Sequence, residues 1–114
     1  MFQRDAAHAK ARALVAKMTL EEKMSQLAYG APAIERLGVP AYNWWNEGLH
    51  GVARAGVATS FPQAIALSAM FDREALKSVS RATALEGRAK YNEFTKHDDR
   101  DIYKGLTFFS PNIN

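Results

Sequence analysis

The distance along the chain between two strand-like segments is the feature that most limits the fold. Residues 41–45 are rich in aromatic side chains, and residues 106–109 form a second apolar segment that ends before Pro111. Both patterns are typical of strands. About sixty residues, with helices predicted among them, separate the two segments, as a parallel pair of strands requires. The sequence therefore predicts a helix-rich α/β architecture.

Two helices are expected before the first strand. Apolar residues three and four positions apart predict an amphipathic helix over residues 5–17. Thr19 and Glu22 have the spacing of a capping box, which predicts a second helix over residues 20–29, and Gly30 supplies a stop signal.

Two further helices are expected between the strands. Pro62 suits the first turn of a helix, because its missing N–H would have no partner there, and it predicts a helix over residues 62–70. Asp72 is a suitable N-cap for a long helix over residues 73–96.

Three residues near the middle of the long helix bear on its packing. Glu86 and Lys90 have the i,i+4 spacing of a favourable ion pair. Gly87 costs a helix interior about 1 kcal/mol relative to Ala. Its presence indicates either close packing against another element or neutral drift.

The architecture is incomplete within this chain. The 114 residues, 47% of them hydrophobic, are expected to form one domain over residues 1–114. Two strands cannot close a barrel or bury both faces of a sheet, and an exposed strand edge invites pairing with another chain. The chain is therefore expected to be part of a larger fold or to assemble with a partner. Self-association through its unpaired strands is one such assembly.

Composition argues against several classes of function. The formal charge of +3 is spread without a run of like charges, which argues against nucleic-acid binding. The sequence has no Cys, so disulfides, thiolate zinc sites and thiol nucleophiles are excluded, and we expect neither a metal nor a cofactor. No apolar run of about 18 residues occurs, and residues 1–10 lack the apolar stretch of a secretory signal. A cytoplasmic protein without membrane association is expected, unless a leader peptide has been removed.

The most informative cluster spans residues 42–51. It places two Trp residues, Glu47 and His50 in the loop after a predicted strand, where α/β barrels build active sites. Aromatic faces match the C–H faces of sugar rings, and a carboxylate beside them accepts hydrogen bonds from sugar hydroxyls. On residue types alone a structural role is favoured over binding for Trp44 and Trp45, with one as core and the other as interface. For His50 a structural or supporting role is favoured, since no second His or Cys lies at metal-ligand spacing.

Three further acids, Asp98, Asp99 and Asp101, offer a second carboxylate for glycoside hydrolysis. They precede a predicted strand, and in a barrel that end lies opposite the reactive face. Charged residues in such loops are usually solvated or ion-paired. We therefore expect that these acids do not act together with Glu47.

Several separated motifs resemble the N-terminal domain of family 3 glycoside hydrolases. The matching segments are residues 18–27, 42–53, 59–63, 88–92 and 100–114, and they cover nearly the whole chain in order. Residues 44–51 are similar to the branch of the family that contains β-xylosidases. The resemblance implies that the chain is the N-terminal portion of a TIM-type (β/α)8 barrel.

The resemblance also implies a sugar-binding role for three residues. The carboxylate at the position of Glu47 binds sugar hydroxyls in the family, and Asn46 and His50 are expected in the same subsite. Many β-glucosidases carry a shorter Asp at this position. Glu47 therefore favours a pentose, because its extra methylene occupies the space of a hexose hydroxymethyl group.

The catalytic residues implied by the resemblance are expected outside this chain. The family is retaining, with an Asp nucleophile on a later strand and a Glu acid/base from a following domain. The resemblance thus implies part of an enzyme that removes β-linked sugars, with xylose favoured, from the non-reducing ends of oligosaccharides or from aryl glycosides, as in xylan degradation. The isolated chain is expected to be inactive. The alternative is a non-catalytic, self-associating or partner-binding fragment.

Overall fold

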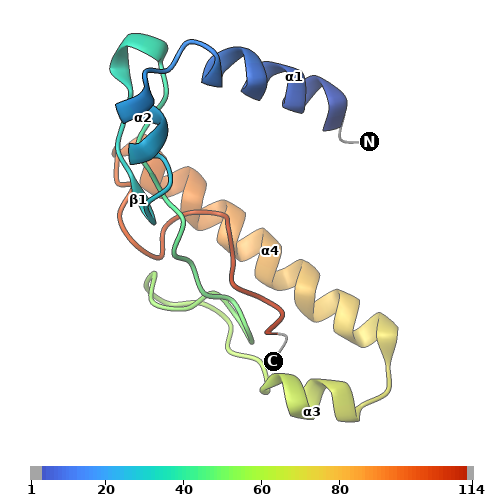
Figure 1. Cartoon of the computed structure of the whole chain (residues 1–114). Helices are drawn as coiled ribbons and strands as arrows, with labels where there is room; N and C mark the ends of the chain where they lie inside the picture. The colour runs from blue at the N-terminus through green and yellow to red at the C-terminus, as the bar shows by residue number, and fades with distance from the viewer. Residues whose placement is uncertain (1–3, 113–114) are drawn as a thin grey trace. The chain divides into compact units, whose positions relative to one another are not determined.

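The computed structural model describes residues 4–112 (Figure 1). The chain divides into two compact units, with the boundary between Tyr42 and Asn43. The elements in chain order are α1 (Arg4–Val15), α2 (Leu20–Ser25), β1 (Gly30–Ala31), the short 3-10 helix η1 (Glu35–Leu37), β2 (Tyr42–Asn43), α3 (Ala64–Ala69) and α4 (Arg73–Lys96). None of the helices within residues 4–112 is long and apolar enough to cross a membrane.

Helix α2 begins at the capping box predicted from the sequence. The hydroxyl of Thr19 accepts a hydrogen bond from the backbone N–H of Glu22 at 3.2 Å. In return, the backbone N–H of Thr19 donates to the Glu22 carboxylate at 2.8 Å. The helix ends at Ser25, earlier than the predicted residue 29, because Gln26 is its C-cap and its side chain donates to the carbonyl of Pro32 at 2.9 Å. The predicted helix over residues 20–29 was therefore too long.

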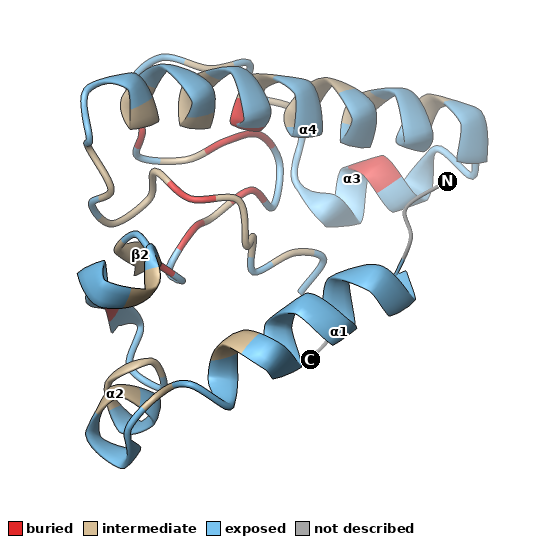
Figure 2. Cartoon of the chain, turned by 90° about the horizontal axis from the view of Figure 1, so that it is seen from above, coloured by how far each residue is buried: buried red, intermediate tan, exposed pale blue. Residues whose placement is uncertain are grey.

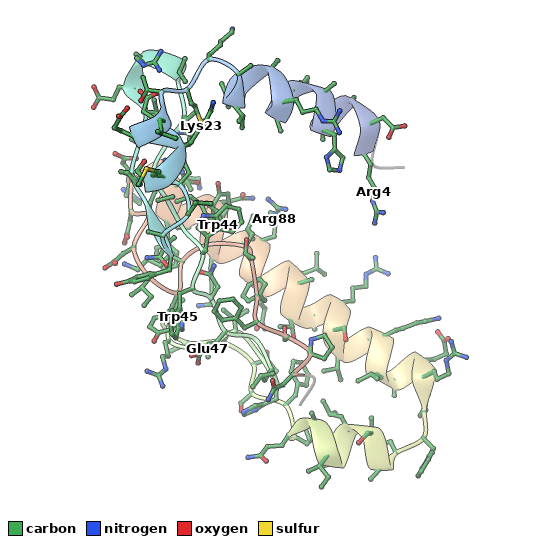
Figure 3. The ribbon with its side chains drawn as sticks, in the orientation of Figure 1. Arg4, Lys23, Trp44, Trp45, Glu47 and Arg88 are labelled. Carbon is green, nitrogen blue, oxygen red and sulfur yellow. The ribbon has the colours of Figure 1, made fainter. Side chains whose placement is uncertain are left out.

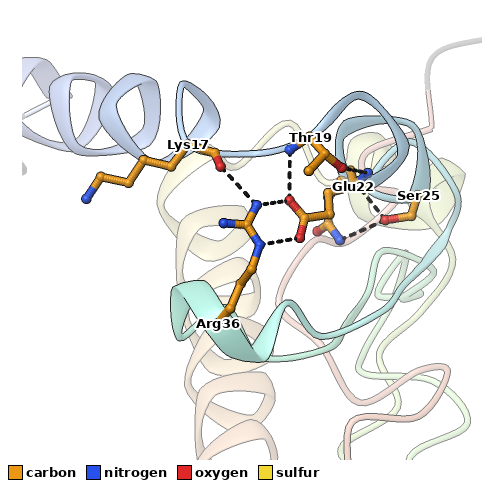
Figure 4. A network of polar contacts seen from close by, with 6 residues as sticks. Lys17, Thr19, Glu22, Ser25 and Arg36 are labelled. Carbon is orange, nitrogen blue, oxygen red and sulfur yellow. Dashed lines mark hydrogen bonds and ion pairs between the residues drawn. The ribbon is translucent and has the colours of Figure 1, made fainter.

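Arg36 connects three segments of the first unit (Figure 4). Its guanidinium binds both oxygens of Glu22, with a distance of 2.8 Å from Nε to Oε1. It also donates to the carbonyl of Lys17 at 2.9 Å. Planar bidentate pairs of this kind combine charge with a fixed geometry. The hydrogen bonds from Arg36, and then that from the Thr19 N–H, lower the pKa of Glu22 below its ordinary value.

The sheet differs from the one predicted. The first strand, expected over residues 41–45, contains only Tyr42–Asn43, and it pairs with β1 (Gly30–Ala31). The segment 106–109 makes a single parallel bridge, between Phe108 and Asn46, instead of a continuous strand. The parallel direction was correctly anticipated, but the extent of pairing was not. The predicted barrel stays a prediction, because residues 4–112 contain helices and one small two-stranded sheet.

Helix α4 runs over the residues predicted for it. Asp72 caps it, and its carboxylate accepts from the backbone N–H groups of Glu74 and Ala75, each at 3.0 Å. Helix α3 begins at Ala64 with Gln63 as its N-cap, so the expected start at Pro62 was two residues early.

The ring of Phe108 lies between two glycines of the second unit. A Cβ added to Gly87 of α4 would lie 2.7 Å from Phe108 Cζ, and one added to Gly48 would lie 3.0 Å from Phe108 Cδ1. Figure 1 shows the segment that carries Phe108 (red) passing beside α4. Close packing therefore explains Gly87, and drift does not need to be invoked.

Few apolar side chains are buried in either unit. The buried hydrophobic residues are Ala31, Ile34, Val52, Ala55 and Leu67. Figure 2 shows α1 exposed almost throughout, and no residue of α1 is buried. Val57 and Phe71 are each 95% exposed. No other part of residues 4–112 covers the apolar side chains of Val57 and Phe71 to any large extent.

The effect of Gly87→Ala on the free energy of unfolding should change sign when the Phe108 ring is removed. Gly87→Ala should lower the free energy of unfolding by about 1 kcal/mol, because overpacking costs about 1–3 kcal/mol and Ala returns about 1 kcal/mol of helix propensity. In a Phe108→Ala background the same substitution should be stabilising, since the ring that it meets is gone. Urea unfolding of the four proteins tests this. A stabilising effect in both backgrounds would contradict the packing argument.

The ion pair of the first unit predicts a dependence of stability on pH. Because folding lowers the pKa of Glu22, its stabilising contribution is present above the unfolded-state pKa, about 4.3, and is lost as the pH falls through the lower folded-state pKa. Arg36→Gln should reduce the loss of stability between pH 6 and pH 3, as followed by urea unfolding and circular dichroism. Arg12→Gln on α1 is the control for removal of one positive charge. An unchanged pH dependence in Arg36→Gln would refute the prediction.

Candidate functional site

A buried amide organises the segment after β2. Asn46 is 0% exposed, and each of its polar side-chain atoms has a partner. Its Nδ2 donates to the carbonyls of Asn43 and Thr107, each at 3.1 Å, and its Oδ1 accepts from the N–H of Gly105 at 2.6 Å. The amide therefore joins the segment after β2 to the C-terminal segment. This burial indicates that Asn46 positions its neighbours, and direct contact with a sugar stays a prediction.

Backbone hydrogen bonds reinforce this junction. The N–H of Tyr103 donates to the carbonyl of Trp45, and the N–H of Phe109 donates to the carbonyl of Asn46, both at 2.9 Å. Gly105 needs to be a glycine here, because an added Cβ would lie 2.7 Å from both the Asn43 carbonyl oxygen and Asn46 Nδ2.

Glu47 follows this junction and remains accessible. Its side chain is 35% exposed, and one oxygen, Oε1, lies 3.5 Å from Nε1 of Trp45, which donates to it. Figure 3 shows Trp45 and Glu47 next to each other on the segment after β2. The other oxygen, Oε2, lies 3.6 Å from Nε of Arg54. The carboxylate is thus oriented from two sides while part of it faces solvent.

Neither Trp side chain is core, contrary to one of the alternatives left open by the sequence. Trp44 is 45% exposed and Trp45 is 42% exposed. The Trp45 ring meets the Phe109 ring edge to face, with 5.8 Å between centroids and 76° between planes. An exposed indole face beside a carboxylate is suited to contact with a sugar ring.

Arg54 and Tyr103 are two residues of this site that sequence reasoning missed. The Arg54 guanidinium lies 5.4 Å from the centroid of the Tyr103 ring, and its Nη1 donates to the Tyr103 hydroxyl at 3.4 Å. Arg54 also has a positive φ of 61°, which a side chain other than Gly seldom adopts. The two residues are 49 positions apart, so the sequence gave no local signal of the contact.

Glu47 and His50 line one cavity of about 240 Å³. The other lining residues are Leu49, Gly51, Val52, Ala53, Ala58, Thr59 and Ser60. His50 Nδ1 lies 2.8 Å from the carbonyl oxygen of Phe61. A carbonyl can only accept, so Nδ1 carries the proton, and in the neutral ring Nε2 is an acceptor. The site thus offers two acceptors, the Glu47 carboxylate and this imidazole nitrogen.

A loop folded back on the motif forms part of the cavity wall. The N–H of Phe61 donates to the carbonyl of His50 at 2.7 Å. Gly51 has a φ of 127°, and an added Cβ would lie 2.1 Å from the carbonyl oxygen of Thr59. Only glycine permits this close approach of the two backbones.

Two residues of α4 also hold this loop. The Glu86 carboxylate accepts from the N–H of Thr59 at 3.0 Å and from its hydroxyl at 2.5 Å. Lys90 Nζ donates to the carbonyl of Ala55 at 2.7 Å. The expected ion pair between Glu86 and Lys90 is therefore replaced by contacts of each residue with the loop. The hydrogen bonds from Thr59 lower the pKa of Glu86 below its ordinary value, and the charge of Lys90 adds a smaller effect in the same direction.

The acids near residue 100 make local ion pairs. Arg100 Nε lies 3.0 Å from Asp98 Oδ1, and Lys104 Nζ lies 2.6 Å from Asp99 Oδ2. The hydrogen bond from Lys104 lowers the pKa of Asp99. None of these acids lines the cavity of Glu47. Within residues 4–112, no group of three or more His, Asp or Glu side chains is arranged to hold a metal ion.

Comparison with known proteins gives the class of the chain. Curated relatives include "Probable beta-D-xylosidase 7" of Arabidopsis thaliana, 44% identical over 115 residues, and "Probable exo-1,4-beta-xylosidase xlnD" of Neosartorya fischeri, 46% identical over 116 residues. "Probable exo-1,4-beta-xylosidase bxlB" of Aspergillus terreus is 44% identical over 116 residues. Each match covers 92% of this chain but only 14% of the relative's length. No family model matches the chain.

These matches make the chain homologous to glycosidases. More narrowly, it is homologous to one segment of the β-xylosidases, which confirms the resemblance to glycoside hydrolase family 3.

The buried amide predicts a large effect on stability. Asn46→Ala should lower the free energy of unfolding by about 2–3 kcal/mol, because each buried group left unsatisfied costs about 1–3 kcal/mol. Asn92→Ala, at an exposed position of α4, is the matched control, and it should change stability by less than about 0.5 kcal/mol. Urea unfolding measures both. Equal effects of the two substitutions would show that the Asn46 hydrogen bonds contribute little.

Proposed function

We propose that this chain is part of a retaining glycoside hydrolase that removes β-linked xylose from the non-reducing ends of oligosaccharides or from aryl glycosides. The observation that carries the proposal is the position of Glu47. Its carboxylate is partly exposed and shares a cavity with His50, in a chain whose relatives are named as β-xylosidases.

The two acceptors of the cavity suit a polyhydroxylated ligand. A carboxylate takes hydrogen bonds from hydroxyl donors with more strength than a neutral acceptor does. Trp45 and Arg54 contact one oxygen each, at 3.5 and 3.6 Å, so the carboxylate of Glu47 has a restricted orientation. His50 adds the neutral acceptor Nε2, because Nδ1 keeps its proton and donates it in a hydrogen bond to the Phe61 carbonyl.

The preference for a pentose rests on the length of Glu47. Relative to Asp, Glu47 carries its carboxylate one methylene further towards the ligand. A hexose has a hydroxymethyl group that xylose lacks, and rejection of this group by a filled space would favour xylose.

A cytoplasmic location for the protein remains a prediction from the sequence.

The chemistry itself is proposed to need residues outside this segment. The family resemblance implies an Asp nucleophile and a Glu acid/base elsewhere in the enzyme. Asp98 and Asp99, which the sequence offered as a second carboxylate for hydrolysis, are ion-paired and do not line the cavity. We therefore propose that residues 1–114 bind a sugar without hydrolysing it.

One observation favours a second candidate, a self-associating or partner-binding segment. Leu27, Val57 and Phe71 are exposed by 87%, 95% and 95% of their surface. Apolar side chains exposed to this degree are typical of surfaces that another polypeptide covers. Light scattering on the samples used below separates the monomer from an assembly.

The sugar-binding proposal is tested by titrating the chain with methyl β-D-xyloside and methyl β-D-glucoside while amide NMR signals are followed. The xyloside should shift the signals of Glu47 and His50 at lower concentration than the glucoside. Glu47→Asp should narrow this difference, because the shorter side chain frees space for a hydroxymethyl group. Glu93→Asp, on the exposed side of α4, is the matched control.

Two results would count against the proposal. Signals of the cavity that do not respond to the xyloside would remove the sugar-binding role. A pentose preference unchanged in Glu47→Asp would remove the explanation of specificity.

The unsubstituted chain, residues 1–114, should release no nitrophenol from 4-nitrophenyl β-D-xyloside.

A further inference from the structure

We propose that Glu86 of α4 is a positioning residue for the sugar subsite: by fixing Thr59 it holds His50 with Nδ1 protonated and Nε2 presented as an acceptor. The inference rests on the proposed sugar-binding role of the cavity. Glu86 itself is not among the residues that line this cavity, so its effect has to pass through the loop.

The first step is the contact between Glu86 and Thr59. The carboxylate accepts two hydrogen bonds from one residue, from the backbone N–H at 3.0 Å and from the hydroxyl at 2.5 Å. A pair of bonds from a helix to one loop residue fixes both the position and the rotation of that residue. The lowered pKa of Glu86 is consistent with an ionised carboxylate as acceptor.

The second step is the confinement of Thr59 between two elements. Its N–H and hydroxyl bind Glu86, and its carbonyl oxygen would lie 2.1 Å from a Cβ added to Gly51 of the motif. Thr59 lines the cavity together with Glu47 and His50. A shift of Thr59 therefore changes the wall that a ligand would touch.

The third step leads from Thr59 to the imidazole. Phe61, two residues further on, exchanges two hydrogen bonds with His50: its N–H donates to the His50 carbonyl at 2.7 Å, and its carbonyl accepts from Nδ1 at 2.8 Å. The tautomer of His50 is thus set by the position of the Phe61 carbonyl. Lys90 fixes the beginning of the same loop through the carbonyl of Ala55, so α4 holds the loop at two points.

The test compares Glu86→Gln with the wild-type chain by ¹⁵N NMR of the histidine ring, without any sugar. A glutamine keeps the shape but loses the charge, and it can meet the Thr59 hydroxyl only if its amide donates to Oγ1, so a charge-assisted pair of bonds becomes a weaker neutral pair. The Nδ1–H tautomer of His50 should lose population at least about two-fold, and the amide signals of Thr59 and Phe61 should move. Glu93→Gln is the matched control, because Glu93 lies on the same helix and pairs with Lys96 instead of the loop.

Substitutions of Thr59 give an independent measurement in which Glu86 is intact. Thr59→Val removes the hydroxyl donor and should reproduce the shift in tautomer, whereas Thr59→Ser keeps the donor and should behave like the wild-type chain. A purely structural contribution of side-chain volume predicts the opposite order, since Val is closer to Thr in volume. This pair also decides the matter if Glu86→Gln fails to fold.

Titration with methyl β-D-xyloside then separates this inference from the proposed function. Affinity should fall about five-fold in Glu86→Gln and stay unchanged in Glu93→Gln. A wild-type chain that does not bind the xyloside, with a tautomer that still responds to Glu86→Gln, would refute the sugar role and leave the positioning of His50 intact. An unchanged tautomer in both Glu86→Gln and Thr59→Val would overturn the inference, whatever the sugar does.

Discussion

The second unit depends on one buried amide group. Asn46 is completely enclosed, and it satisfies two carbonyls and one N–H that belong to three different backbone positions. Buried backbone groups need partners, and here a side chain supplies what a continuous sheet would otherwise provide. Because Asn46 immediately precedes Glu47, the hydrogen bonds of Asn46 also fix the backbone position from which the Glu47 side chain extends.

The candidate site is assembled from a loop that has little regular structure. Its geometry comes from contacts at defined points: Arg54 on Glu47, Phe61 on His50, and Glu86 on Thr59. The first two contacts join residues within the loop, and the third joins the loop to α4. Helix α4 supports the loop through Glu86 and Lys90. Ligand-binding residues are often found on loops that helices or strands hold in place.

The sequence predicted local features well and long-range contacts poorly. The capping box of Thr19 and Glu22 and the bounds of α4 follow from neighbouring residues, so periodicity and spacing were sufficient for them. The role of Arg54 depends on Tyr103, and that of Glu86 depends on Thr59, at separations for which a sequence carries no local pattern. The segment 106–109 read as a strand because of its apolar residues, but its backbone bonds are few and its Phe108 ring is used for packing instead.

That ring has a consequence for how related sequences can vary. Phe108 fills a space bounded by Gly48 and Gly87, so the volumes of the three side chains are not independent. A methyl group gained at one glycine needs a smaller residue at position 108 or a displaced ring. Substitutions at these positions should therefore occur as matched sets in evolution, and a residue transplanted singly from a relative should be tolerated less well than the whole set exchanged together.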